Sequence, residues 1–151
     1  MRVKLENLKK HGTYTHACYD RLIFNKVKAL LGGRVRTLVT GSAPIAADVM
    51  DFLCICFCAP MQEGYGMTET TGGAFMQVRS DPTAGNVGGP NANTKMRLRD
   101  IEEMGYLATN DPPRGEICFK GAQVTPGYYA NPEKTREAFD AEGWLLSGDV
   151  G

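Results

Sequence analysis

Long apolar runs and an excess of charge of either sign are both missing from this sequence of 151 residues. The longest apolar stretch, 52–61, is about half the roughly 20 residues that a membrane helix needs. The N-terminus lacks the apolar segment of a secretory signal peptide. Lys+Arg and Asp+Glu both number 17, so no net field attracts nucleic acid or anionic lipid. We therefore expect no membrane span and no nucleic-acid partner for this chain.

Cysteine is scarce, and the number and spacing of the cysteines do not suggest disulfide pairs. The five cysteines are Cys18, Cys54, Cys56, Cys58 and Cys118. An odd number, with three at alternate positions of an apolar run, does not suit a disulfide framework and favours a reducing, intracellular compartment. Zinc sites pair cysteines at C-x-x-C spacing or add nearby histidines, and neither occurs here. We interpret these residues as buried cysteines that pack as small hydrophobic side chains.

The N-terminal part is predicted to be helical. The mildly basic start, with Arg2, Lys4, Lys9 and Lys10, is interpreted as a solvated helix face rather than a binding patch. Apolar residues at helical spacing predict a helix over 14–31, which the following glycine pair ends. His11 and His16 have no other ligand type at a suitable spacing, and we expect both to face solvent.

The next segment has the pattern of a β-α-β unit. A strand is predicted at 35–39, and it runs directly into a turn at 40–44. A helix at 46–58 follows, with Val49, Phe52, Leu53 and Cys56 on one face and a proline at its end. A short strand at 61–63 leads into a glycine-flanked loop at 64–73. Loops after parallel strands emerge at one sheet edge, where ligands of open α/β sheets bind, so the turn at 40–44 and this loop should face each other.

The second half is rich in glycine and proline, which separate short candidate strands at 95–99, 116–120 and 144–146. One helix is predicted at 132–139. Asn131 suits its N-cap, and Pro132 suits its first turn. The sequence therefore predicts an α/β fold in two parts, a helix plus β-α-β portion over 1–80 and a β-rich subdomain over 81–151.

The loop at 64–69 carries the residue types of a nucleotide site. Gly64 and Gly66 flank Tyr65, whose flat ring could stack on a purine. Thr68 and Glu69 place a hydroxyl donor beside a carboxylate, a pair that can hold a phosphate oxygen and a magnesium ion. A glycine-rich turn with a core tyrosine and a surface glutamate explains the same spacing equally well, because short motifs often match by chance.

Five segments in order resemble motifs of the adenylate-forming (AMP-binding) superfamily. They are Val39-Thr40-Gly41-Ser42-Ala43-Pro44, Glu63-Gly64-Tyr65-Gly66-Met67-Thr68-Glu69-Thr70, Val87-Gly88-Gly89-Pro90, the run from Gly115-Glu116-Ile117-Cys118 to Gly127-Tyr128-Tyr129, and Trp144-Leu145-Leu146-Ser147-Gly148-Asp149. Five ordered matches over about 18–151 are much more specific than one. Segments 22–27, 31–36 and 52–60 are most similar to the long-chain fatty acyl-CoA synthetases of this superfamily.

The resemblance implies a reaction and its substrates. A fatty carboxylate attacks the α-phosphate of ATP, which gives acyl-AMP and pyrophosphate, and coenzyme A then displaces AMP to form the thioester. It also implies that this chain is an internal piece of the large N-terminal domain of such an enzyme. The expected partners are ATP or AMP, Mg²⁺, a long-chain fatty acid and coenzyme A.

The resemblance assigns roles to individual residues. Tyr65 would stack on adenine, with Gly41, Ser42, Ala43 and Pro44 on the other side. Thr68 would bind the α-phosphate, and Glu69 would hold Mg²⁺. The remaining loop residues expected to contact the nucleotide are Glu63, Gly64, Gly66 and Met67.

Two further assignments complete the predicted site. Asp149 would accept hydrogen bonds from both ribose hydroxyls, although without the resemblance a turn or helix-capping aspartate is the preferred interpretation. Gly72, Gly73 and Ala74 would leave room for the acyl chain. Ser42 stands where many relatives have a second glycine. Tyr128 and Tyr129 are expected to pack at a turn rather than to bind ligand.

Parts of the superfamily pattern are not seen in this sequence. The Ser/Thr/Gly-rich loop over the β- and γ-phosphates would precede it, and the hinge and the catalytic lysine domain would follow it. We therefore expect the isolated chain to be inactive. Three alternatives stay open: a non-catalytic nucleotide- or acyl-binding module, a piece of a coumarate ligase, or a piece of a peptide-synthetase adenylation domain. The parent is expected at the endoplasmic reticulum membrane, the peroxisome membrane or in the cytoplasm.

Overall fold

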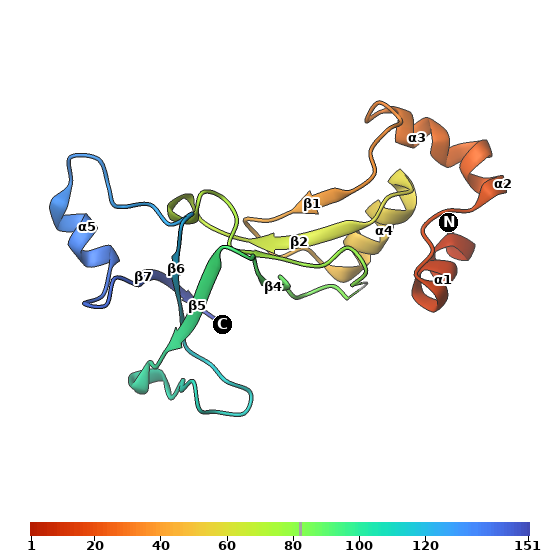
Figure 1. The fold of residues 1–151 in the computed structure, drawn as a ribbon. Coiled ribbons are helices and arrows are strands. Elements are labelled where there is room, and N and C mark those ends of the chain that lie inside the picture. The colour runs from red at the N-terminus through yellow and green to blue at the C-terminus, as the bar shows by residue number, and fades with distance from the viewer. Residues whose placement is uncertain (82) are drawn as a thin grey trace. The chain divides into compact units, whose positions relative to one another are not determined.

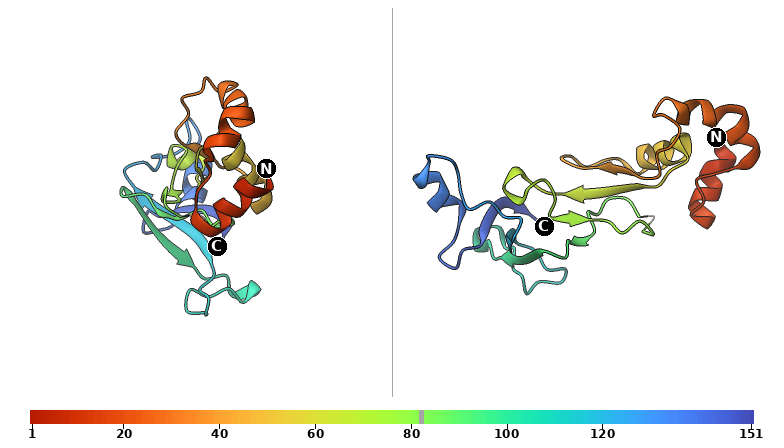
Figure 2. Two further views of the ribbon diagram at one scale, coloured as in Figure 1. Left: turned by 90° about the vertical axis from the view of Figure 1, so that its right-hand side faces the viewer. Right: turned by 45° about the horizontal axis from the view of Figure 1, so that its top comes forward.

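A computed structural model describes residues 1–81 and 83–151. Contacts divide the chain into two compact units, which interleave along the sequence. The first unit comprises Met1–Tyr65 and Phe75–Gly89, and the second comprises Gly66–Ala74 and Pro90–Gly151. The predicted division into 1–80 and 81–151 stays a prediction. Figures 1 and 2 show the elements of each unit.

The first unit contains the predicted β-α-β arrangement. Strands β1 (Leu38–Thr40) and β2 (Met61–Tyr65) are parallel, with Leu38 opposite Met61, and helix α4 (Ala47–Phe57) connects them. The arrowheads of β1 and β2 point the same way in Figure 1. Strand β3 (Phe75–Met76) pairs with β2 in the antiparallel sense, and the sheet order is β1-β2-β3-β4, with β4 at Gly89–Pro90. The α/β fold class is therefore confirmed.

The strand predicted at 35–39 begins three residues later than expected. Its partner strand starts at Met61, and the register sets Leu38 against that residue. Residues before Leu38 would have to pair with the segment around Cys58, which ends α4 in a left-handed conformation with φ 53°. A strand cannot extend where its partner backbone is not extended.

Helix α4 matches the predicted range of 46–58 to within one residue, but its buried face differs from the expected one. Met50, Cys54, Ile55 and Cys56 are buried, whereas Val49 and Phe52 are exposed. The helix is apolar on most sides, so its periodicity does not select one face. The helices that pack on it, α1 (Arg2–His11) and α3 (Asn25–Ala29), select the face instead.

The helix predicted over 14–31 is present as one continuous helical segment over 17–29. It consists of α2 (Ala17–Tyr19), a π-helical turn η1 (Asp20–Phe24) and α3. The π turn carries Asp20 and Phe24, whose side chains both meet Lys4 of α1. Local π-helical turns often occur at functional or strained positions of a helix, and this one carries both residues that contact Lys4.

The prediction that the basic start is a solvated face is wrong for Lys4. Its side chain is completely buried, and its Nζ lies 2.5 Å from Oδ1 of Asp20. The same Nζ donates to the carbonyl of Ile55 at 2.7 Å and lies 4.0 Å from the ring centroid of Phe24. Composition cannot reveal this arrangement, because the partners are 16 and 51 residues away in the chain.

The second unit contains a three-stranded antiparallel sheet and a helix. The three strands and the helix were predicted from the sequence, and the structure adds their antiparallel pairing. Its strands are β5 (Thr94–Arg99), β6 (Glu116–Gly121) and β7 (Leu145–Val150), in the order β5-β6-β7. Helix α5 spans Pro132–Ala138, and the Asn131 side chain accepts a hydrogen bond from the Lys134 amide at 3.0 Å. This is the expected N-cap. The short helical turns are η2 (Thr68–Thr70) and η3 (Glu102–Met104).

The cysteine interpretation is confirmed for four of the five residues. Cys54, Cys56, Cys58 and Cys118 are buried, Cys18 is exposed, and all five are free thiols. Burial raises the pKa of each of the four buried thiols above its ordinary value. They therefore stay protonated and pack as apolar groups. Among the residues that the structure describes, no helix is long and apolar enough to cross a membrane.

Candidate functional site

The turn predicted to lie beside adenine directly follows β1. Residues Gly41–Pro44 are all exposed. An added Cβ at Gly41 would lie 3.0 Å from the carbonyl oxygen of Gly64, so the turn and the end of β2 come close together. Gly64 is still part of β2, and this closeness continues the register that pairs Thr40 with Glu63. That the turn faces the loop beyond Tyr65 stays a prediction.

Ser42 adopts a left-handed conformation with φ 68°. Glycine takes this conformation without steric cost, whereas a residue with a Cβ is strained there. The structure thus gives a physical reason why glycine suits this position. The hydroxymethyl group of Ser42 is exposed, so it does not displace a neighbouring core side chain.

A buried glutamate, Glu63, holds the end of β2 in place. Glu63 is only 5% exposed, and its carboxylate accepts a hydrogen bond from the Gly85 amide at 2.8 Å. Its own amide donates to the side-chain oxygen of Gln77 at 2.7 Å. Glu63 therefore ties the segment after β3 to β2. Its predicted contact with a nucleotide stays a prediction.

Tyr65 is the last residue of β2 and is half-buried. It pairs with Phe75 in the strand register, and their ring centroids lie 5.9 Å apart with the planes tilted by 57°. The neighbour fixes one side of the tyrosine and favours a defined ring orientation. Such a held ring is what stacking on a purine requires.

The predicted loop continues into the second unit at the Tyr65–Gly66 peptide. There the chain forms the tight turn η2. The Met67 amide donates to the Thr70 hydroxyl at 3.0 Å, and that hydroxyl, completely buried, lies 3.0 Å from the Met67 carbonyl. A Cβ on Gly66 would lie 2.5 Å from the carbonyl oxygen of Gly72. Only glycine fits at that point, so the two ends of the loop touch through their backbones.

This turn exposes Thr68 and leaves Glu69 half-buried. The Tyr128 hydroxyl donates to Oε1 of Glu69 at 2.6 Å, and the Thr125 amide donates to the Glu69 carbonyl at 2.8 Å. The hydrogen bond to Glu69 raises the pKa of Tyr128, because it stabilises the protonated phenol. Partial burial and the negative charge of the carboxylate act in the same direction.

The chemistry of this carboxylate is compatible with Mg²⁺. Magnesium in nucleotide sites is held by one or two carboxylates, water and the phosphates themselves rather than by a complete protein cage. Glu69 supplies one such carboxylate beside the Thr68 hydroxyl. The described residues contain no cluster of three or more His, Cys, Asp or Glu side chains that could form a cage.

The small residues after the turn are held by Asn91. The Asn91 amide donates to the Ala74 carbonyl at 2.9 Å, and its side chain donates to the Gly73 carbonyl at 3.3 Å. Ala74 is completely buried, whereas Gly72 is exposed. The proposed acyl-facing role of these three residues stays a prediction.

Asp149 lies in β7, on an exposed stretch of that strand. The pairing of β7 with β6 is irregular here: Cys118 pairs with Leu146 and Glu116 with Val150, so β7 has two more residues than β6 between these pairs. Gly148, with φ 75°, occupies this bulge. Bulges commonly redirect a side chain next to a functional site.

A buried glutamate stabilises the bulge. Glu116 is 6% exposed, and its Oε1 accepts from the Gly148 amide at 2.9 Å. Its other oxygen lies 2.5 Å from Nη2 of Arg99. The Asp149 amide donates to the Ser147 hydroxyl at 3.0 Å. The backbone amides of Gly148 and Asp149 are therefore both hydrogen-bonded to side chains.

Two contacts at the predicted site were not foreseen from the sequence, that of Tyr128 with Glu69 and that of Glu116 with Gly148, which precedes Asp149. Tyr128 was expected to pack at a turn, yet its hydroxyl binds Glu69 from 59 positions away. Tyr129 is fully exposed, so the expectation of packing is wrong for it. Glu116 was recognised only as part of a strand. No spacing pattern marks either contact, because both depend on pairing between distant segments.

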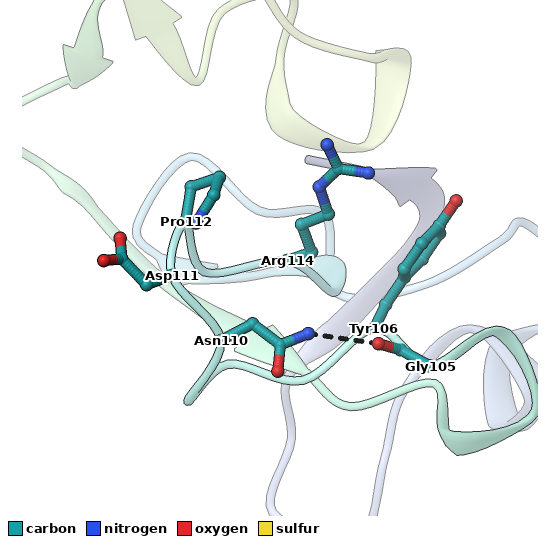
Figure 3. Close-up of a pocket in the computed structure, with 6 residues that line it drawn as sticks. All are labelled: Gly105, Tyr106, Asn110, Asp111, Pro112 and Arg114. Carbon is teal, nitrogen blue, oxygen red and sulfur yellow. Dashed lines mark hydrogen bonds between the residues drawn. The ribbon is translucent and has the colours of Figure 1, made fainter.

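A hollow of about 410 Å³ also lies in the second unit but involves none of the predicted residues. Figure 3 shows the residues that line it. The Asn110 side chain donates to the Gly105 carbonyl at 3.0 Å, and the Arg114 guanidinium lies 5.7 Å from the Tyr106 ring centroid. The residues that line it are all exposed or half-buried, and none of them belongs to the predicted site.

Comparison with known proteins gives consistent results. The family model described as AMP-binding enzyme matches residues 5–129. Long chain acyl-CoA synthetase 7, peroxisomal, from Arabidopsis thaliana is 46% identical over 93% of this chain and 20% of its own length. Long-chain-fatty-acid–CoA ligase 1 from Homo sapiens is 47% identical over 90% of this chain and 19% of its own length.

Solved structures show the same fold. The A domain of carboxylic acid reductase from Segniliparus rugosus, in complex with AMP and a co-purified carboxylic acid, has a TM-score of 0.66 at 32% identity, over 97% of this chain and 22% of that one. Apo MatB from Rhodopseudomonas palustris has a TM-score of 0.67 at 33% identity, over 79% of this chain and 23% of that one. The chain spans about a fifth of the length of the curated relatives it matches.

Proposed function

Since this chain belongs to the AMP-binding enzyme family, we propose that it forms part of the nucleotide site of a long-chain fatty acid–CoA ligase. The observation that best supports this proposal is the loop from Gly64 to Glu69. This loop leaves β2 beside the turn at Gly41 and forms η2, where the Tyr128 hydroxyl binds the Glu69 carboxylate. The relatives named as long-chain acyl-CoA synthetases and ligases support the substrate class, since they are 41–47% identical over this region.

The proposed chemistry begins with the binding of ATP. Tyr65 stacks on adenine, with Gly41, Ser42, Ala43 and Pro44 on its other side, and Asp149 accepts hydrogen bonds from the ribose diol. The Thr68 hydroxyl donates to an α-phosphate oxygen. Glu63, Gly64, Gly66 and Met67 complete the nucleotide contacts.

The fatty carboxylate then attacks the α-phosphorus, and pyrophosphate leaves. Glu69 would hold Mg²⁺, which when bound neutralises charge on the phosphate oxygens. Gly72, Gly73 and Ala74 present a surface without bulky side chains to the acyl chain. In the second step the coenzyme A thiol displaces AMP and forms the thioester.

The proposed setting is inside the cell, at a peroxisomal or endoplasmic reticulum membrane or in the cytoplasm. Two Arabidopsis relatives are named as peroxisomal. The four buried, free cysteines suit a reducing compartment.

The test is a substrate panel on a protein of the relatives' length that contains this chain. We expect ATP-dependent thioester formation with saturated and unsaturated long-chain fatty acids. We expect no comparable rate with coumarate, amino acids or malonate. Preference for any of those three over a long-chain fatty acid would refute the proposed substrate class while leaving the adenylate-forming site intact.

A further inference from the structure

The contact between Tyr128 and Glu69 joins two segments that are far apart in the sequence. Tyr128 lies between β6 and α5, and Glu69 lies in the turn η2. The donor–acceptor distance of 2.6 Å is that of a strong hydroxyl–carboxylate hydrogen bond. Only Oε1 of Glu69 receives it, which leaves Oε2 available for another ligand.

The backbones of the two segments are tied together as well. The Thr125 amide donates to the Glu69 carbonyl at 2.8 Å, and the Thr71 hydroxyl donates to the Gln123 carbonyl at 2.7 Å. The segment before Tyr128 is therefore hydrogen-bonded to Glu69 itself and to Thr71, the residue that follows η2. The hydroxyl and the carboxylate share one rigid frame.

Tyr128 is itself anchored from its other side. Its amide donates to the Thr135 hydroxyl at 2.9 Å, and that hydroxyl donates to the Asn131 carbonyl at 2.9 Å. These bonds fix the Tyr128 backbone to the first turn of α5. The next residue, Tyr129, is 100% exposed and forms no hydrogen bond through its hydroxyl within the described part of the chain.

We propose that Tyr128 is a positioning residue for the metal-binding carboxylate, which its hydroxyl holds so that Oε2 of Glu69 presents one orientation to a divalent cation. The inference rests on the proposed role of Glu69 in the nucleotide site. A glutamate side chain loses considerable rotamer freedom when it binds an ion. A hydrogen bond that already restricts this side chain removes part of that entropic cost, as outer partners of metal ligands generally do.

The experiment measures binding of Mn²⁺ in the presence of ATP by electron paramagnetic resonance, with the 151-residue chain and three variants. Tyr128→Phe removes only the hydroxyl, Tyr129→Phe removes the neighbouring exposed hydroxyl as a matched control, and Glu69→Gln removes the ligand. We expect Tyr128→Phe to weaken Mn²⁺ binding by about 10- to 100-fold, the usual effect of losing an outer partner. Tyr129→Phe should bind as the unchanged chain does.

Metal-free ATP binding, measured with a chelator present, separates positioning from a general structural effect. We expect Tyr128→Phe to leave this affinity and the thermal unfolding midpoint unchanged, because the ring stays and its backbone bonds are intact. Equal weakening of metal-free ATP binding would show a structural role instead and overturn the inference.

The remaining outcomes distinguish the inference from its premise. If Glu69→Gln weakens Mn²⁺ binding and Tyr128→Phe does not, the inference is wrong and the role of Glu69 stands. If Glu69→Gln binds Mn²⁺ as tightly as the unchanged chain, or the unchanged chain binds no Mn²⁺ with ATP, the proposed metal role fails and the inference fails with it.

Discussion

At the scale of single residues, the first unit contains a completely buried lysine, Lys4, that forms an ion pair with Asp20. Its charge is neutralised by Asp20, and the remaining protons of its ammonium group meet the Ile55 carbonyl and the Cys58 sulfur at 2.7 and 3.2 Å. Burial by itself raises the pKa of Asp20. The hydrogen bonds from Lys4 and from the His16 amide lower the pKa by more than burial raises it, so the net pKa lies below the ordinary value. The pair thus links α1, η1 and α4.

Removing one member of this pair should destabilise the chain. Asp20→Asn leaves the ammonium group of Lys4 buried without a counter-charge, which typically costs about 3–5 kcal/mol. Urea unfolding followed by circular dichroism measures this loss. The matched control is the double variant Lys4→Met with Asp20→Asn, which should recover most of the stability because no buried charge remains. A single variant as stable as the unchanged chain would show that the pair does not form.

The same pair predicts a dependence of stability on pH. The folded-state pKa of Asp20 is depressed, so its contribution is complete above the unfolded-state pKa of about 3.9 and is lost as pH falls through the lower folded-state value. The unchanged chain should therefore lose stability in this acid range more steeply than the double variant does. Parallel slopes for the two proteins in acid would contradict the assignment.

The thiols offer a second prediction at this scale. Burial raises the pKa of four cysteines, and Cys118 is completely inaccessible. Because the thiolate is the reactive form, iodoacetamide at neutral pH should modify Cys18 alone in the folded chain and all five cysteines in urea. Peptide mass spectrometry identifies the sites. Rapid labelling of Cys54 or Cys58 without denaturant would show that helix α4, which contains Cys54 and ends at Cys58, is not packed as described.

At the scale of elements, the bulge in β7 connects the fold to the predicted ribose contact. Gly148→Ala places a Cβ on a residue with φ 75°, and such strain costs about 1–3 kcal/mol. We expect a lower unfolding midpoint and a reduced preference for AMP over 2′,3′-dideoxy-AMP, since Asp149 follows directly. Gly89→Ala is the control, because no atom lies within 4 Å of its added Cβ and its φ is not positive.

An unchanged preference in Gly148→Ala, together with a lower midpoint, would mean that the bulge stabilises the sheet without directing Asp149. An unchanged midpoint as well would mean that the irregular pairing between Glu116 and Val150 does not form in solution.

The elements that could be predicted are those defined by local pattern. Helix α4, helix α5 with its Asn131 cap, and strands β5 and β6 lie within one or two residues of their predicted limits, because capping, proline and alternation act over a few residues. The parallel pairing of β1 with β2 followed from their order and the intervening helix. The late start of β1 did not, since it depends on where Cys58 ends α4.

The loop of the candidate site could be predicted from the sequence, but the distant residues that hydrogen-bond to the site could not. The glycines and the Thr68–Glu69 pair form a recognisable local string, and the closeness of Gly41 to Gly64 follows from β-α-β geometry. The contacts of Tyr128 with Glu69 and of Glu116 with Gly148 span 59 and 32 positions. Nothing in the local sequence around Tyr128 or Glu116 specifies which distant polar group each will meet.

At the scale of the whole molecule, the chain corresponds to about a fifth of its curated relatives. Stabilisation of charge on the transferring phosphoryl group needs cations placed around it, and single groups of this kind are often worth several kcal/mol. In the described residues Thr68 and Glu69 supply one hydroxyl and one carboxylate but no cation. We expect pyrophosphate exchange with a fatty acid, assayed on this chain alone, to stay at background. Activity near that of a full-length relative would refute this expectation.

In the proposed function, the end of β2 and the turn after β1 contact adenine. Photolabelling of the chain with 8-azido-AMP, followed by tandem mass spectrometry, tests this contact most directly. We expect labelling at Gly41–Pro44 and at Gly64–Tyr65, suppressed by excess AMP and reduced in Tyr65→Ala. Labelling confined to other segments, or labelling that AMP does not suppress, would contradict it.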